Sequence, residues 1–196
     1  QAQQHMYITQ WESAGPLVGD SHTPPAIALR SRSHVSQATE SKGAICKLAS
    51  SIVFSVPLAE RVGASPRELP IMDAAFDLVR LQLTARLVPM YILSPGAQPA
   101  SPSLGMHPSH GGLLGLSRTV RSEQPTAQIA CIDISLVEKT SVDAALRAAA
   151  AETLSGKVDE PELAVCGDQR RVPRLAEAAQ SLGGPIHMHF GSRGVI

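Results

Sequence analysis

The stretch GGLLGLSRTVRSEQPTAQIACID, from Gly111 to Asp133, decides the fold of this 196-residue chain. It predicts a helix that stops at Pro125, followed by a short buried strand. The expected apolar side of the helix is Leu113, Leu114, Leu116 and Val120, and the expected solvent side is Ser117, Arg118, Arg121 and Ser122.

The start of this helix combines a capping residue with three glycines. Ser109 is an acceptable N-cap. Gly111, Gly112 and Gly115 each cost about 1 kcal/mol relative to alanine in a helix. We therefore expect the helix to be pressed closely against other backbone.

Strand and helix patterns alternate on both sides of this stretch. Short apolar runs predict strands over residues 7–11, 51–56, 89–93, 128–134, 161–166 and 170–175. Helices are predicted over 71–87, with Ser65 and Pro66 as a possible start, and over 141–154, with a capping box at Thr140 and Asp143 and a stop at Gly156. This alternation predicts an α/β fold, a truncated Rossmann-like parallel sheet flanked by helices.

Three of these segments carry finer expectations. In the helix over 71–87 the polar residues fall on one stripe, and the rest of the helix surface is expected to be buried. The stripe consists of Asp73, Asp77, Arg80 and Thr84. The inner face of the helix over 141–154 is expected to be Val142, Ala145, Leu146 and Ala149. Pro173 predicts an edge strand. Residues 15–43 lack a sustained period and predict a loop, with one short strand at 26–30.

Composition limits the classes of function. The 17 basic and 17 acidic residues give a formal net charge of zero, and no basic block indicates a nucleic-acid partner. No apolar run approaches the roughly 20 residues that cross a membrane, and residues 1–10 do not resemble a signal peptide. Cys46, Cys131 and Cys166 are odd in number and widely spaced. Cys131 and Cys166 fall inside predicted strands, which predicts buried free thiols and a reducing, cytoplasmic location.

Motifs for reductase chemistry are missing from the sequence. No G-x-G-x-x-G is present, so we expect Gly111, Gly112 and Gly115 to serve packing, not phosphate binding. A reductase of this kind also needs a proton donor, commonly Tyr with a nearby Lys. Tyr7 and Tyr91 lack that spacing, and packing is expected for both.

The remaining candidates also favour structural roles. His187 and His189 share one strand face but lack an evident third metal ligand. His107 and His110 flank the start of the central helix. Ser117 lacks the second glycine of a nucleophile elbow and follows no strand, so we reject it as a nucleophile.

Three arginines leave two interpretations open. Arg118, Arg121 and Arg174 are either solvated or capping residues, or they meet an acidic partner surface. We therefore assign no catalytic, cofactor-binding or metal-binding residue in this chain.

The central helix and the terminal hairpin resemble the non-catalytic structural subdomain of the ketoreductase region in modular polyketide synthases and animal-type fatty acid synthases. The residues that carry the likeness in the central stretch are Gly115, Leu116, Ser117, Arg118, Glu123, Gln124, Pro125, Ile132 and Asp133. Ser117 stands where the family usually has Gly, and Gln124 where it often has His. The hairpin is similar over Glu162, Leu163, Ala164, Val165, Arg170, Arg171, Val172, Pro173, Arg174 and Leu175.

The resemblance implies a division of the chain into four parts. Residues 1–6 would be a leader, 7–176 the structural subdomain and 177–184 a linker. Residues 185–196 (PIHMHFGSRGVI), with the pair Arg193-Gly194, are similar to the start of an enoylreductase domain.

Function follows from the resemblance as an expectation. The chain would be a scaffold that stabilises the catalytic ketoreductase half of a synthase, with its sheet edge and glycine-rich helix as the flat apolar surface. NADPH and phosphopantetheine are implied for the parent synthase and no cofactor for this chain. The partners would be the catalytic half, the enoylreductase domain and possibly the acyl carrier protein, with no nucleic acid and no membrane. The alternatives are a divergent NADP(H)-dependent short-chain reductase and a free-standing acyl-carrier-binding module.

Overall fold

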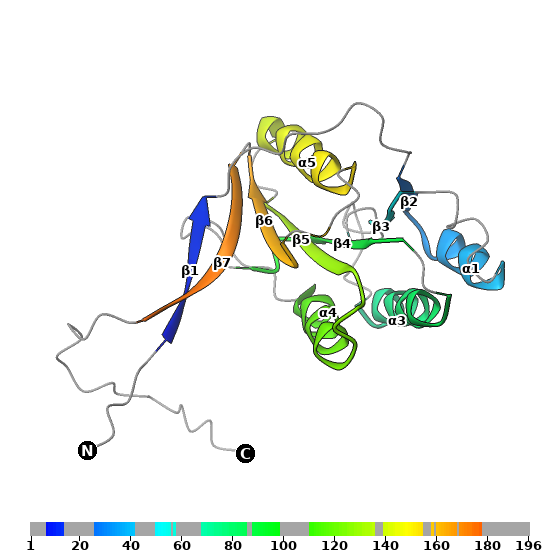
Figure 1. Ribbon diagram of the computed structural model, residues 1–196. Helices are drawn as coiled ribbons and strands as arrows, with labels where there is room; N and C mark the ends of the chain where they lie inside the picture. Colours follow the sequence, from blue (N-terminus) through cyan, green and yellow to red (C-terminus); the bar gives the residue numbers. More distant parts are fainter. Residues whose placement is uncertain are drawn as a thin grey trace, which may run out of the picture.

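The computed structural model describes residues 7–13, 26–41, 50–55, 57, 68–85, 88–98, 110–135, 139–154, 158, 160–167 and 169–177. Within them, a seven-stranded sheet runs in the order β1-β7-β6-β5-β4-β3-β2, with helices on both of its faces (Figure 1). The strands are β1 Tyr7–Ser13, β2 Ile27–Leu29, β3 Ile52–Phe54, β4 Met90–Pro95, β5 Ile129–Ser135, β6 Glu162–Cys166 and β7 Gln169–Glu177. The helices are α1 Arg32–Glu40, α3 Glu68–Ala85, α4 Gly111–Glu123 and α5 Lys139–Leu154.

The sheet is mostly parallel, which confirms the predicted fold class. Each neighbouring pair from β2 to β6 is parallel. β7 is antiparallel to both β6 and β1. The two-residue turn between β6 and β7 contains Gly167, whose φ of 63° lies in the region that glycine adopts without strain.

Alternate residues of the central strands point to opposite faces of the sheet. Met90 and Ile92 of β4 pack in the core beneath α1, α3 and α4, whereas Tyr91 and Leu93 pack in the core on the other face, with Ala149 of α5. These strands read as continuous apolar runs because both faces are covered (Figure 1).

The amphipathic pattern of α3 is confirmed. The predicted polar stripe is exposed: Asp73, Asp77, Arg80 and Thr84. The opposite side of the helix is buried in the core, through Ile71, Ala74, Ala75, Leu78 and Val79. The inner face of α5 was predicted less well, because Leu146 is 40% exposed although Ala149 is buried.

The prediction of a loop over 15–43 was wrong at α1. Ser31 caps this helix, with its side chain accepting a hydrogen bond from the backbone N–H of His34. Only Val35 and Ala38 of α1 are buried, so the apolar period is too sparse to reveal the helix in the sequence. The short strand expected at 26–30 is present as β2.

Three expectations for α4 were also wrong. Its N-cap is His110, which makes no side-chain capping bond, and not Ser109. Ser117 is fully buried, not on the solvent side. The glycines are not pressed against backbone: an added Cβ at Gly111 or Gly115 would meet nothing within 4 Å, and at Gly112 it would meet the Met72 side chain. The helix ends at Glu123, just before Pro125, as predicted.

Pro173 does not make β7 an edge strand. β7 lies between β6 and β1, and Pro173 is opposite Trp11 of β1. The register with β6 extends only from Gln169 to Arg171, so Pro173 lies past the end of that ladder. Proline cannot donate to a ladder, and at this position it interrupts none with β6.

Several predictions lie outside the described residues. They are the leader over 1–6, Ser65 and Pro66, Gly156, the linker over 178–184 and the segment 185–196. The side chains of Thr140, Val142, Asp143 and Ala145 are likewise not described.

Candidate functional site

The carboxyl ends of β4 and β5 form the candidate site, because α/β folds bind ligands at the carboxyl edge of a parallel sheet. Asp133 of β5 occupies this edge and is 2% exposed. Its Oδ1 accepts hydrogen bonds from Ser94 Oγ and from the Ala97 backbone N–H, both at 2.7 Å. Its Oδ2 accepts one from the Gln98 backbone N–H at 2.9 Å.

These bonds fold the segment after β4 over the end of the sheet. Gly96 makes the turn with a φ of 63°, and its N–H donates to the carbonyl of Ile134. Burial raises the pKa of Asp133, while the hydrogen bonds from Ser94 and the backbone oppose that rise. Two backbone donors of the described segment after β4, the Ala97 and Gln98 N–H groups, are therefore bound to a carboxylate of the chain itself. In the sequence, Asp133 belongs to the family resemblance alone, and no local pattern indicates this role.

A second polar cluster joins α4 to β6 across β5. Glu162 of β6 is 8% exposed. Arg118 donates to it twice, from Nε to Oε1 at 2.7 Å and from Nη2 to Oε2 at 2.6 Å. Arg121 donates from Nη2 to Glu162 Oε1 at 2.6 Å and from Nη1 to the Ile129 carbonyl at 3.3 Å. The hydrogen bond to Glu162 raises the pKa of Arg118 further above its ordinary value.

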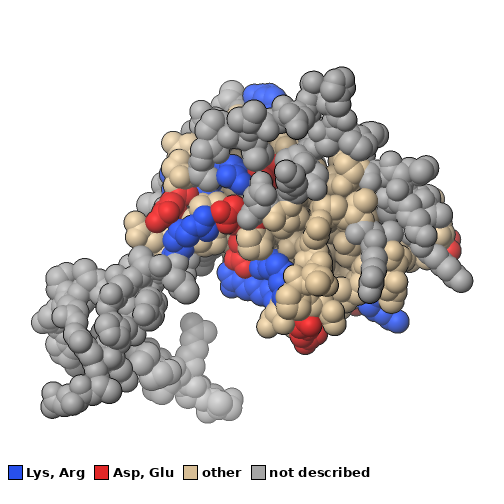
Figure 2. Space-filling model, in the orientation of Figure 1, with Lys and Arg blue, Asp and Glu red and all other residues tan. Residues whose placement is uncertain are grey.

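Two further ion pairs connect to β7. Arg170 of β7 donates twice to Glu152 of α5, at 2.8 and 3.0 Å, and the Glu152 side chain is only 3% exposed. Arg174 donates to Glu160 at 2.5 and 3.1 Å near the surface, and this pair lowers the pKa of Glu160. Charged side chains of both signs accordingly gather on one side of the face in Figure 2.

These contacts correct the expectation for the arginines. Arg118, Arg121 and Arg174 are neither simply solvated nor reserved for an outside partner, because each binds a glutamate of the same chain. The structure brings Arg118 and Arg121 together on one carboxylate and leaves Arg174 apart from them. No spacing in the sequence indicates the two pairs on Glu162, because this residue lies 44 positions after Arg118 and 41 positions after Arg121.

Ser117 and Cys131 form a buried contact beneath α4. Ser117 Oγ lies 2.9 Å from the Leu114 carbonyl and 3.1 Å from Cys131 Sγ. Burial raises the pKa of the Cys131 thiol to about 11, so it is protonated near neutral pH. Both side chains are buried in the core beneath α4. Neither Cys131 nor Cys166 is in a disulfide; Cys131 is buried, as predicted, whereas Cys166 is only half-buried. Cys46 lies outside the described residues.

The remaining candidates are spread across the chain. Tyr91 is 1% exposed in the core under α5, as expected for a packing residue, and the side chain of Tyr7 is not described. His110 is buried at the start of α4, while His107, His187 and His189 lie outside the described residues. In the part of the chain that the structure describes, no three His, Cys, Asp or Glu side chains are grouped as metal ligands. No described helix is long and apolar enough to span a membrane.

The fold is that of polyketide synthase ketoreductases. An A-type ketoreductase from a modular polyketide synthase matches with a TM-score of 0.64 and 20% identity over 91% of this chain and 44% of its own. The ketoreductase from the first module of phoslactomycin biosynthesis in Streptomyces sp. HK803 matches with a TM-score of 0.55 and 16% identity, over 88% of this chain and 38% of its own. A multidomain structure of a keto acid-selecting NRPS module, with adenylation, ketoreductase and pseudo Asub domains, matches with a TM-score of 0.67 and 15% identity. The match covers 88% of this chain and 18% of that structure.

These likenesses establish the fold alone, since every identity is below 25%. This chain spans less than half the length of each of these structures. No protein-family model and no curated protein matches it.

Proposed function

We propose that this chain is the non-catalytic scaffold half of a synthase ketoreductase region, which stabilises a catalytic half that reduces carrier-bound β-ketoacyl chains with NADPH. The ketoreductase-type fold supports the family, and the quoted likeness of the central helix and the terminal hairpin supports the subdomain. In this proposal, NADPH and the phosphopantetheine arm are bound by other parts of the parent synthase.

The observation that carries the proposal is the Asp133 cluster at the carboxyl edge of the sheet. Dinucleotide-binding folds hold the pyrophosphate on backbone N–H groups of a strand-to-helix turn at this edge of the sheet. In this chain the Ala97 and Gln98 N–H groups bind the Asp133 carboxylate, and Ser94 donates to it as well. A carboxylate at this place also repels a phosphate.

Strand order supports the same conclusion. Doubly wound folds bind dinucleotides in the crevice where the strand order reverses. The described parallel strands follow each other in chain order from β2 to β6, without such a reversal among them. The ion pairs that join α4 to β6 and α5 to β7 suit a rigid support.

Co-expression tests the proposal. The catalytic half of the parent ketoreductase would be produced with and without this chain, and the NADPH-dependent reduction of a β-ketoacyl thioester measured. We expect the soluble yield and the activity of the catalytic half to depend on this chain. Full activity of the catalytic half alone would contradict a scaffold role, and reduction by this chain alone would favour the divergent reductase.

A further inference from the structure

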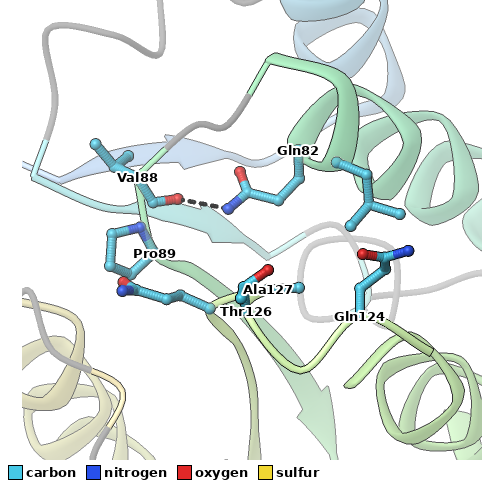
Figure 3. A pocket seen from close by; sticks show the side chains of 8 residues that line it. Gln82, Val88, Pro89, Gln124, Thr126 and Ala127 are labelled. Atoms are coloured by element: carbon cyan, nitrogen blue, oxygen red, sulfur yellow. Dashed lines mark hydrogen bonds between the residues drawn. The ribbon is translucent and has the colours of Figure 1, made fainter. Parts of the chain in front are cut away.

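A hollow of about 600 Å³ lies between the C-terminal ends of α3 and α4 (Figure 3). It is at the amino edge of the parallel sheet, opposite the edge that Asp133 occupies, because its walls include the segments that lead into β4 and β5. The described residues that line it are Gln82, Leu83, Val88, Pro89, Gln124, Thr126, Ala127 and Gln128. Its volume is within the range of known ligand pockets.

Side-chain amides and a hydroxyl form the polar part of this lining. Gln82 is 5% exposed, and its Nε2 donates to the Val88 carbonyl at 2.9 Å, so its amide is held in place in the wall. Gln124, the C-cap of α4, comes from a different wall of the hollow (Figure 3). Gln124, Thr126 and Gln128 are exposed, and each of these side chains can both donate and accept a hydrogen bond.

Charge restricts the class of ligand. No charged side chain is among the described residues of the lining. The C-termini of α3 and α4 carry partial negative charge on their last carbonyl groups. In the last turn α3 has no basic residue, and Arg121 of α4 is bonded to Glu162 and to the Ile129 carbonyl. A phosphate or carboxylate is therefore disfavoured, and a cation would meet no carboxylate of the described lining.

The apolar part of the lining suits one aliphatic side chain. Leu83, in the last turn of α3, is 40% exposed, and Val88, Pro89 and Ala127 are each partly buried. Covering Leu83 would remove apolar surface from water, which favours binding. The hollow thus combines uncharged hydrogen-bonding groups with an apolar wall.

We infer that this hollow binds an extended, uncharged peptide segment. Its main-chain amides lie against Gln124, Thr126 and Gln128, and one aliphatic side chain lies against Leu83. An extended segment carries N–H and C=O groups along its edges, and a glutamine amide offers a matching acceptor and donor side by side. The inference goes beyond the scaffold role, because it assigns a separate contact at the amino edge of the sheet.

Peptide titration of the full chain, followed by NMR of isotope-labelled protein, tests the inference. The probe is a blocked pentapeptide of glycine, serine, leucine, serine and glycine. Two matched peptides carry aspartate or lysine in place of the leucine. We expect the leucine peptide to shift the backbone signals of Thr126 and Gln128 saturably, with a dissociation constant on the order of 1 mM. The two charged peptides should bind more weakly.

Matched variants locate the contact. The double variant Gln124→Ala/Gln128→Ala removes two exposed amides of the lining. The control Gln37→Ala removes an exposed glutamine of α1 that is not in the lining. We expect the double variant to bind the leucine peptide about tenfold more weakly than wild type, as for the loss of two hydrogen-bonding groups, and the control to bind as wild type does. Thermal denaturation would verify that both variants fold.

The other outcomes overturn the inference. The absence of a saturable shift with the leucine peptide up to about 10 mM would show that the hollow does not bind such a segment. Tighter binding of the aspartate or lysine peptide would show that the ligand is charged. Equal binding by wild type and the double variant would place the contact elsewhere. None of these results affects the co-expression test of the scaffold role, so the two proposals fail separately.

Discussion

Arg118 of α4 holds Glu162 of β6 through two parallel N–H···O bonds of 2.7 and 2.6 Å. The pair spans β5, and Arg121 adds a third charged donor to the same carboxylate. Glu162 is buried, and both guanidinium groups donate charge-assisted hydrogen bonds to its carboxylate. The glycine-rich helix is thereby fixed on the sheet by charge as well as by apolar packing.

Replacing this carboxylate should destabilise the fold. Glu162→Gln removes the charge that compensates both arginines, and we expect a loss of about 2–4 kcal/mol in the free energy of unfolding. Urea denaturation of the wild-type and variant chains measures it. The matched control is Glu160→Gln, which breaks the more exposed pair with Arg174 and should change stability much less. Equal effects of the two variants would contradict a special role for Glu162.

Asp133 should make stability depend on pH. Its pKa in the folded chain is raised, chiefly by burial, so the folded chain binds a proton that the unfolded chain has released. The stability difference between wild type and Asp133→Asn should therefore fall as pH rises from about 4 through the folded pKa, and then level off. Denaturation at a series of pH values measures this difference. A difference that grows with pH would show that the hydrogen bonds to Asp133 outweigh its burial.

The two described cysteines should differ in reactivity. Cys131 is 1% exposed with a pKa of about 11, whereas Cys166 is half-buried. Maleimide labelling of the folded chain at neutral pH, mapped by mass spectrometry, should modify Cys166 well before Cys131. Labelling in denaturant should remove the difference. Rapid modification of Cys131 in the folded chain would contradict its position beneath α4.

Gly115 offers a stabilising substitution. Nothing lies within 4 Å of an added Cβ at this helical position, so Gly115→Ala should raise the free energy of unfolding by about 0.5–1 kcal/mol. At Gly112 the same change meets Met72 Sδ at 3.2 Å, so its gain should be smaller. Thermal denaturation of the two variants compares them. A destabilised Gly115→Ala variant would mean that α4 is packed there more closely than described.

The elements that could be predicted are those whose pattern of apolar and polar residues is visible within a single segment of the sequence. Continuous apolar runs predicted β3, β4 and β5, and the polar stripe of Asp73, Asp77, Arg80 and Thr84 predicted the exposed side of α3. Helix α1 was missed because its core contacts are only Val35 and Ala38, and the cap at Ser31 is a weak signal by itself.

The candidate site depended on tertiary contacts that no local pattern contains. The burial of Ser117 follows from its contact with Cys131, fourteen residues away. The bonds from Ser94, Ala97 and Gln98 to Asp133 bring together residues 35 to 39 positions apart. The resemblance of the sequence marked Asp133 as important, but only the structure supplies a physical role for it.

Titration of the purified chain with NADPH, followed by cofactor fluorescence, tests the central claim most directly. The claim is that the chain has a ketoreductase-type fold whose carboxyl edge is occupied by its own Asp133 carboxylate. We predict no saturable binding up to cofactor concentrations on the order of 1 mM, which corresponds to less than about 4 kcal/mol of binding free energy. Saturable binding with a dissociation constant on the order of 10 μM or below would contradict the account and favour a divergent reductase.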